Sequence, residues 1–358
     1  MNRLHIPSDL HQFILLPAMA RKKYKGLLAS QTVFEQEAEN SAFNFYKDGS
    51  DKSKGILTTG LAYNYLMENF PERDLPYPVL KISQYPLPRK LVRKLAADTE
   101  EILVIEEGYP FVEEMLTGIL QTGIKVKGRL DDTLPRDGEL NADIVAAAFG
   151  VVPNNRKQVP AVVANRPPEL CPGCGHTDVY LALNEAMKPY GKGKVFSDIG
   201  CYTLGALPPL NAIDSCVDMG ASVTMAVGAA DAGLEPSVAV IGDSTFTHSG
   251  MTGLLDAVDK NSPITLIISD NSAAAMTGGQ HSEGTGKLKQ ICIGLGVDPA
   301  HLKEFIPLRK NHDANVKILE KELKYKGVSV ILAQRECVQT AARRKRLEAA
   351  ARKGEMIK

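Results

Sequence analysis

The sequence has no cysteine before residue 171, no net charge and no apolar run long enough to cross a membrane. A membrane-spanning helix needs about 20 consecutive apolar residues, so none is expected. The start of the chain also lacks the apolar core and small-residue cleavage site of a secretory signal, which predicts a cytoplasmic protein. Because 42 basic residues balance 42 acidic ones, the overall charge indicates neither nucleic acid nor an acidic membrane as a partner.

The six cysteines all lie after residue 170. They are too few for a disulfide scaffold in a chain of 358 residues. In a cytoplasmic protein, such clustering favours a metal or redox site over disulfide bonds.

Apolar, β-rich runs alternate with helical patterns, which predicts an α/β protein of two domains with mainly parallel sheets. We expect a leader segment at 1–50, a small α/β domain at 51–150, a proline-rich linker at 151–170, a second α/β domain at 171–340 and a basic helical tail at 341–358. The strands expected are 55–59, 78–82, 102–105, 124–126, 194–197, 237–241, 264–269 and 328–333. The main helices expected are 88–96, 110–120, 176–188, 222–232 and 250–260.

The tail carries the run Arg343-Arg344-Lys345-Arg346, which favours a solvated helix face, with docking onto a partner subunit as the alternative.

Two polar side chains follow neighbouring strands of the second domain. Asp243 comes directly after the strand 237–241, and Asn271 follows the strand 264–269, 28 positions later. A helix connects the strands, so both residues are expected at the carboxyl edge of a parallel sheet, where ligands bind. Mg²⁺ prefers oxygen ligands together with phosphates, and a carboxylate, an amide oxygen and the carbonyl of Ala273 would provide them.

The turn after the strand 237–241 suits a diphosphate. Gly242 lets the backbone approach closely, and the N–H groups of Ser244 and Thr245 are placed to donate, whereas a helix at 250–260 starts too late to receive the phosphate. The alternative is a plain strand–turn–helix with Asp243 as a cap. The pair of Asp243 and Asn271 resembles the thiamine diphosphate signature, in which Gly-Asp-Gly is followed by Asn at about this spacing, with Ser244 in place of the usual Gly.

A CxxC motif, Cys171 to Cys174, opens the second domain. It suits a zinc knuckle, a thioredoxin-like redox pair or part of an iron–sulfur site. A zinc ribbon needs a second CxxC or an HxxxH, and neither occurs. A thioredoxin-like motif follows a strand, whereas this one follows a proline-rich segment. An iron–sulfur site needs two more thiolates, for which Cys201 and Cys337 are candidates because both follow strand ends.

Six motifs in order carry a family resemblance: CPGCGH, DIGCYTLG, CVDMGAS, GDSTF, DNSAAAMTGGQ and ILAQREC. Together they resemble the cofactor region of the 2-oxoacid:ferredoxin oxidoreductase family, and within it the large subunits of indolepyruvate:ferredoxin oxidoreductases. The resemblance covers nearly the whole chain. It implies a transketolase C-terminal-like fold for the first domain and a transketolase-like, diphosphate-type fold for the second.

The resemblance also implies the site residues. Cys171, Cys174, Cys201 and Cys337 match the ligands of a [4Fe–4S] cluster, and Asp243, Asn271 and Ala273 match those of Mg²⁺. The residues implied to line the thiamine diphosphate site are Gly200, Cys201, Tyr202, Gly220, Gly242, Asp243, Ser244, Thr245, Asn271, Ala273 and Met276, the last buttressing the bent cofactor. His248 and His281 flank these motifs and are candidates for proton transfer or for a structural role. His176 is expected at a helix start or behind a ligand, and Cys216 and Cys292 in the core.

The activity implied is oxidative decarboxylation of a 2-oxoacid, such as indolepyruvate or another aryl pyruvate, to an acyl-coenzyme A, with electrons leaving through the cluster to ferredoxin. The family's aminopyrimidine-binding domain and its ferredoxin-like CxxCxxCxxxCP run do not occur in the sequence. We therefore expect a split or truncated form that is inactive alone and works as an oligomer with a β subunit and a chain supplying that domain. Two alternatives stay open: a non-redox thiamine diphosphate decarboxylase or carboligase subunit, which needs no positioned cysteines, and a non-catalytic metal-binding interaction protein.

Overall fold

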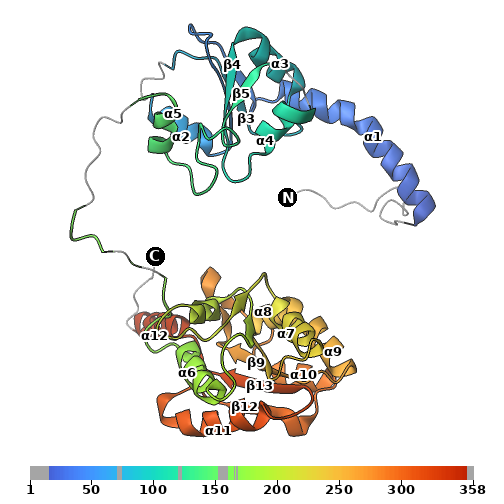
Figure 1. Ribbon diagram of the computed structural model, residues 1–358, viewed down its shortest axis with the longest axis vertical. Coiled ribbons are helices and arrows are strands. Elements are labelled where there is room, and N and C mark those ends of the chain that lie inside the picture. Colours follow the sequence, from blue (N-terminus) through green and yellow to red (C-terminus); the bar gives the residue numbers. More distant parts are fainter. Residues whose placement is uncertain are drawn as a thin grey trace. The chain divides into compact units, whose positions relative to one another are not determined.

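The computed structural model describes residues 16–70, 75–119, 123–151, 160–164, 166 and 168–352 (Figure 1). The chain divides into two compact units, Met1–Val163 and Ala164–Lys358, within the segment assigned as a linker. The predictions for residues 1–15 of the leader and 353–358 of the tail lie outside the described residues.

The first unit contains a five-stranded sheet in the order β1-β3-β2-β4-β5. Its strands are β1 (Phe45–Lys47), β2 (Gly55–Thr59), β3 (Val79–Ile82), β4 (Glu101–Ile105) and β5 (Lys125–Lys127). Every neighbouring pair is parallel except β1 and β3. The four parallel strands match the predicted ones. Strand β1 lies in the segment assigned as leader, and its three residues are too short to show a strand pattern in the sequence.

Helices cover both faces of this sheet. α2 (Ala62–Glu68) and α5 (Ala142–Ala148) cover one face; α3 (Arg89–Asp98) and α4 (Phe111–Glu114), extended by the π-helix η1 (Met115–Ile119), cover the other. Successive strand residues point to opposite faces, so Ile56 joins the first cluster and its neighbour Leu57 the second. The long helix α1 (Pro17–Asn40) contacts the start of α3 through Glu35 and Glu39.

The second unit contains a six-stranded sheet in the order β12-β13-β9-β8-β6-β7, in which every neighbouring pair is parallel. Its strands are β12 (Leu302–Phe305), β13 (Ser329–Gln334), β9 (Ile264–Asp270), β8 (Ser237–Gly242), β6 (Val195–Ser197) and β7 (Ser215–Cys216). The chain passes from β6 to β7 on one side and then to β8 on the other. The crevice between β6 and β8 is therefore a topological switch point, where open α/β sheets bind ligands.

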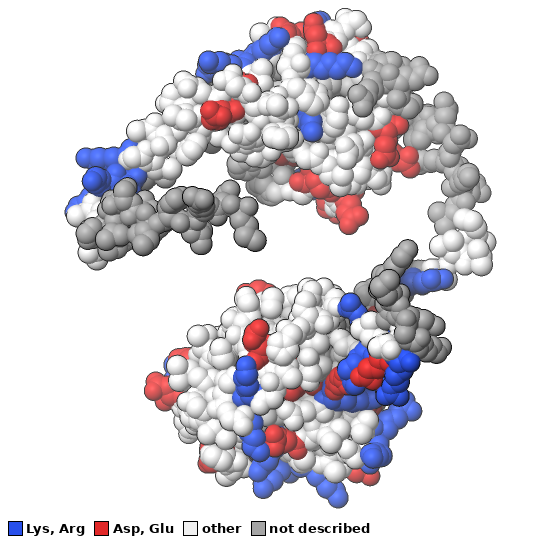
Figure 2. Space-filling view, turned by 180° about the vertical axis from the view of Figure 1, so that it is seen from behind, with Lys and Arg blue, Asp and Glu red and all other residues white. Residues whose placement is uncertain are grey.

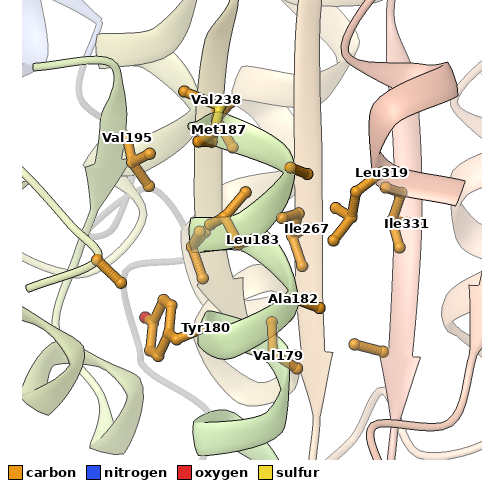
Figure 3. Packing of buried hydrophobic residues seen from close by; sticks show 14 of the residues in the cluster. Val179, Tyr180, Ala182, Leu183, Met187, Val195, Val238, Ile267, Leu319 and Ile331 are labelled. Atoms are coloured by element: carbon orange, nitrogen blue, oxygen red, sulfur yellow. The ribbon is translucent and has the colours of Figure 1, made fainter. Parts of the chain in front are cut away.

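Two helical layers bury this sheet. α6 (Gly175–Met187) and α11 (His312–Glu322) cover one face, and α7 (Ala221–Asp231), α9 (Met251–Asp259) and α10 (Leu288–Gly294) cover the other. Figure 3 shows Leu183 of α6 and Leu319 of α11 directed at Ile267 of β9, and all three are fully buried. Short 3-10 turns complete the fold at η2 (Cys201–Ala206), η4 (Ala275–Thr277), η5 (Pro299–His301) and η6 (Arg309–Asn311).

The last described helix, α12 (Val338–Arg352), has no buried residue. Lys and Arg side chains gather on this part of the surface beside a few acidic ones (Figure 2). Arg344 forms ion pairs with Glu336 and Glu348 at 2.9 and 3.2 Å. A helix is present where the tail was expected, and both the solvated face and the alternative of docking onto a partner subunit stay predictions.

Candidate functional site

A cavity of about 180 Å³ lies at the carboxyl edge of the second sheet, where β6, β8 and β9 end. Parallel pairing brings the segments that follow these three strands to one edge. The predicted cofactor-binding residues that line the cavity are Gly200, Cys201, Tyr202, Gly242, Asp243, Ser244, Thr245, Asn271, Ala273 and Met276. Gly220 lies beside them, next to Met219 of the lining.

Asp243 is a buried carboxylate in the lining of this cavity. Only 2% of the residue is exposed, and burial raises its pKa to about 6. Its Oδ2 atom and the Oγ of Ser244 are buried without a hydrogen-bond partner in the part of the chain that the structure describes. Buried polar atoms are rarely left unpaired, so this pair fits a cation on the carboxylate and a phosphate oxygen at the hydroxyl.

The helix after β8 begins earlier than predicted. α8 (Asp243–Thr245), the π-helix η3 (Phe246–Gly250) and α9 follow one another without a break. The expectation of a helix from 250, too late to receive a phosphate, is therefore wrong. Gly250 resembles a helix start in the sequence, but it lies within the helical run and packs closely on the core, since a Cβ there would lie 2.7 Å from Ile241 Cδ1. The helical run thus starts at the cavity, where a helix N-terminus favours an anion.

A further buried carboxylate, that of Asp198, lies next to the cavity and was not among the residues predicted from the sequence. Asp198 is fully buried after β6 and accepts hydrogen bonds from the hydroxyls of Tyr202 and Ser222. It also accepts from the backbone N–H of Ser222 in the first turn of α7. The Tyr202 ring fills the space beside Gly242, where a Cβ would lie 2.6 Å from its Cε1. An acidic residue directly after a strand, the same signal that identified Asp243, would have pointed to Asp198.

Gly220 is the N-cap of α7 and has a left-handed backbone with φ 100°. A Cβ at this position would collide with the Oγ of Ser249 on η3. Both the backbone conformation and the lack of space therefore require glycine. The close approach brings the start of α7 against η3 at the rim of the cavity.

Asn271 makes three polar contacts, two through its side-chain amide and one through its backbone carbonyl. Its Oδ1 accepts a hydrogen bond from the Ala273 N–H at 3.1 Å, and its Nδ2 lies 3.2 Å from Nε2 of His176. Its backbone carbonyl accepts from the N–H of Cys337 at 2.9 Å. Ser272 takes a left-handed conformation with φ 60°, which turns the chain out of β9. The predicted metal ligand is thus tied directly to the backbone of a predicted cluster ligand.

A second cavity, of about 410 Å³, contains all four predicted cluster cysteines in its lining: Cys171, Cys174, Cys201 and Cys337. All four thiols are free and partly buried. Burial raises the pKa of both Cys174 and Cys201, and the neighbouring thiols of this set add to the effect. The Gln339 amide donates to the Cys171 sulfur at 3.3 Å, and Arg343 and Arg346 of α12 line the same cavity.

The remaining cysteines lie apart from this cavity. Cys292 is fully buried in the core and its pKa is raised to about 12, while Cys216 contacts the Thr203 hydroxyl at 3.8 Å. Across residues 16–352 as far as they are described, no three His, Cys, Asp or Glu side chains converge to hold a single metal ion. The four thiols therefore share a cavity without forming a compact site for one ion.

His248 and His281 are both exposed. His248 lies on η3 with Nδ1 3.0 Å from Ser249 Oγ. His281 belongs to β11 (Gln280–His281), which pairs with β10 (Ala273–Ala274). Within the described chain, neither residue belongs to the lining of the two cavities, so a catalytic role for either stays a prediction.

A family model described as thiamine pyrophosphate enzyme, C-terminal TPP binding domain, matches residues 198–332. This match includes every residue that lines the smaller cavity. It confirms that the second unit contains a thiamine diphosphate-binding domain of the α/β class, with the mainly parallel sheet that the sequence predicts. No helix in the described part of the chain is long and apolar enough to cross a membrane.

The chain is also similar to proteins named indolepyruvate oxidoreductase subunit IorA. It is 33% identical to that of Archaeoglobus fulgidus over 94% of this chain and 56% of the relative. Identity to that of Pyrococcus abyssi is 32%, over 91% of this chain and 55% of the relative. The chain therefore spans little more than half the length of these relatives. A solved 2-oxoglutarate:ferredoxin oxidoreductase from Magnetococcus marinus aligns at 18% identity over 49% of this chain and 66% of that one, with a TM-score of 0.40.

Proposed function

Because the chain is a homologue of the IorA subunits along nearly all its length, we propose that it is the cofactor-binding part of an indolepyruvate oxidoreductase. The observation that carries the proposal is the cavity at the carboxyl edge of the second sheet, with unpartnered atoms of Asp243 and Ser244 buried in its wall. The thiamine pyrophosphate domain match covers the same residues.

In this proposal the smaller cavity takes thiamine diphosphate with Mg²⁺. Asp243 and Asn271 hold the cation through their side-chain oxygens, with the carbonyl of Ala273 as a third ligand. The start of the helical run at Asp243 and the Ser244 hydroxyl receive the diphosphate. When bound, the cofactor supplies the carbon nucleophile that cleaves a 2-oxoacid beside its carbonyl group. The chain contributes by fixing the diphosphate end and by excluding water with Met276 and the Tyr202 ring.

The larger cavity takes a [4Fe–4S] cluster on Cys171, Cys174, Cys201 and Cys337. Each thiolate of such a cluster binds a different iron, so four thiols around one cavity fit it, although they do not converge on a single point. Arg343 and Arg346 place positive charge beside a group that carries negative charge. The hydrogen bond from the Cys337 N–H to the Asn271 carbonyl joins the linings of the two cavities, which supports a group beside the proposed cofactor that accepts electrons one at a time.

The chain spans little more than half the length of its curated relatives, and the proposed assignment of parts concerns this span alone. The partners proposed for it are a chain that supplies the aminopyrimidine-binding domain, a β subunit and ferredoxin. We assign indolepyruvate or a similar aryl pyruvate and coenzyme A as substrates of the assembled oligomer. Free thiols persist in the reducing cytoplasm, which is the compartment we propose.

We expect the purified chain alone to turn over no indolepyruvate in the presence of coenzyme A, thiamine diphosphate, Mg²⁺ and ferredoxin. The reason is that, in the proposed assembly, a partner chain supplies the group that activates the aminopyrimidine ring. Ferredoxin reduction followed by its visible absorbance gives the rate. A sustained rate from the single chain would contradict the division of labour among subunits.

Binding, in contrast, is expected from this chain alone. Thiamine diphosphate with Mg²⁺ should raise the thermal unfolding midpoint, because a ligand at 100 times its Kd stabilises the folded state by about 2.7 kcal/mol. Thiamine without its diphosphate is the matched control, and EDTA should remove the effect. An unfolding midpoint that stays constant with Mg²⁺ and thiamine diphosphate at millimolar concentration would count against the proposed function.

A further inference from the structure

The imidazole of His176 is buried between two residues at the end of β9. Its Nδ1 lies 2.6 Å from Ser269 Oγ and its Nε2 lies 3.2 Å from Asn271 Nδ2. The residue is 4% exposed and belongs to the first turn of α6, two positions after Cys174. Both ring nitrogens are engaged, so the ring cannot turn without losing both contacts.

The contact with the neighbouring backbone shows which amide atom of Asn271 is the oxygen. The N–H of Ala273 can only donate, so the amide atom 3.1 Å from it must be the oxygen. The amide nitrogen then faces His176, and because it too only donates, Nε2 must be an acceptor without a proton. The proton of the neutral ring is therefore on Nδ1, which donates to Ser269 Oγ.

From these contacts we propose that His176 is a positioning residue, which holds the Asn271 amide so that its oxygen, and not its nitrogen, is presented to a divalent cation. The inference rests on the proposed function, since Asn271 meets a cation only if the smaller cavity takes Mg²⁺ with thiamine diphosphate. If the Asn271 amide rotated by 180°, it would present its N–H groups, which repel a cation. Partners that orient metal ligands typically contribute 10- to 100-fold in metal affinity, so about that loss is expected when the Nε2 acceptor is removed.

Two isosteric substitutions separate positioning from packing. In His176→Gln the side-chain oxygen reaches the place of Nε2 and can still accept from Asn271. In His176→Asn the amide nitrogen takes the place of Nδ1 and can still donate to Ser269, but nothing accepts from Asn271. Both variants lose the edge-to-face contact of His176 with the Tyr202 ring, whose centroid is 6.0 Å away. Asn fills less of this buried site than Gln, so the unfolding midpoint of each ligand-free variant shows how much packing it has lost.

The experiment is a calorimetric titration of Mg²⁺ into the full chain at saturating thiamine diphosphate, with the unfolding midpoint of each ligand-free variant measured alongside. We expect H176N to bind Mg²⁺ about 10- to 100-fold more weakly and H176Q to remain close to wild type. Wild-type affinity in H176N, or equal losses in both variants, would overturn the positioning role. A wild-type chain that binds no thiamine diphosphate overturns the proposed function instead.

Ser269→Ala gives an independent test if H176N does not fold. It leaves the ring in place but removes the acceptor for Nδ1, so the tautomer with its proton on Nε2 gains population and Asn271 loses its acceptor. A weaker Mg²⁺ affinity in S269A supports the positioning role. An unchanged affinity in S269A would overturn it.

Discussion

Replacing Asp243 with asparagine is expected to abolish magnesium-dependent binding of thiamine diphosphate. Asparagine has nearly the same size but lacks the charge that Mg²⁺ prefers in a ligand. We expect the affinity to fall at least about 100-fold, or roughly 2.7 kcal/mol, in a calorimetric titration. Asp256→Asn is the matched control, because Asp256 is half exposed on α9 and pairs with Lys260 at 3.0 Å, away from the cavity.

The ligand-free D243N protein provides a second readout, because burial raises the pKa of Asp243 from 3.8 to about 6. A carboxyl whose pKa is higher in the folded chain contributes stability below pH 4 or so, and this contribution is lost as the pH rises through about 6. A pKa shift of this size changes the free energy of unfolding by on the order of 3 kcal/mol. Without ligand, D243N should therefore unfold at a higher temperature than wild type at about pH 8, with the difference vanishing near pH 4.

In the binding experiment, a D243N variant that keeps wild-type affinity for the cofactor would contradict the proposed role of Asp243.

Replacing Cys337 with serine is expected to remove most of the iron that the chain can hold. The wild-type chain, reconstituted without oxygen, should contain about four irons and four sulfides, and C337S well under one of each. The reason is that Cys337 supplies one of four thiols around a single cavity, and no other cysteine in the described chain belongs to its lining. Iron and sulfide analysis with the visible absorbance of the cluster measures the effect.

Cys216→Ser is the control for the cysteine prediction. The Cys216 thiol is partly buried like that of Cys337, but it contacts Thr203 and lies outside the cavity lining. C216S should keep its iron and sulfide. Equal iron in C337S and wild type, or equal losses in C337S and C216S, would refute the assignment of the four ligands.

The sequence predicts the polar ends of the strands because they depend on local order along the chain. Asp243 and Asn271 each follow a run of buried apolar residues, and parallel pairing alone is enough to bring such strand ends together. The same logic predicts Cys201 and Cys337 near one another, and both line the larger cavity. These parts of the candidate site follow from strand order, without knowledge of side-chain packing.

Other parts depend on contacts that local patterns do not reveal. Gly250 resembles a helix start in the sequence, but it packs closely against Ile241 inside the helical run, which begins at Asp243. Strands β7 and β12 have two and four residues, too few for a recognisable period. The hydrogen bond between His176 and Asn271 joins residues 95 positions apart, and only the packing of α6 on β9 creates it.

The proposed function requires one chain to hold both a thiamine diphosphate site and a cluster site. The most direct test is to purify the full chain without oxygen, reconstitute it with iron and sulfide, and measure iron, sulfide and bound thiamine diphosphate in the same sample. The proposed function predicts about four irons and four sulfides per chain, together with thiamine diphosphate that is retained with Mg²⁺ and lost with EDTA. Thiamine diphosphate without iron would indicate a non-redox enzyme, and a sample that holds neither would contradict the account.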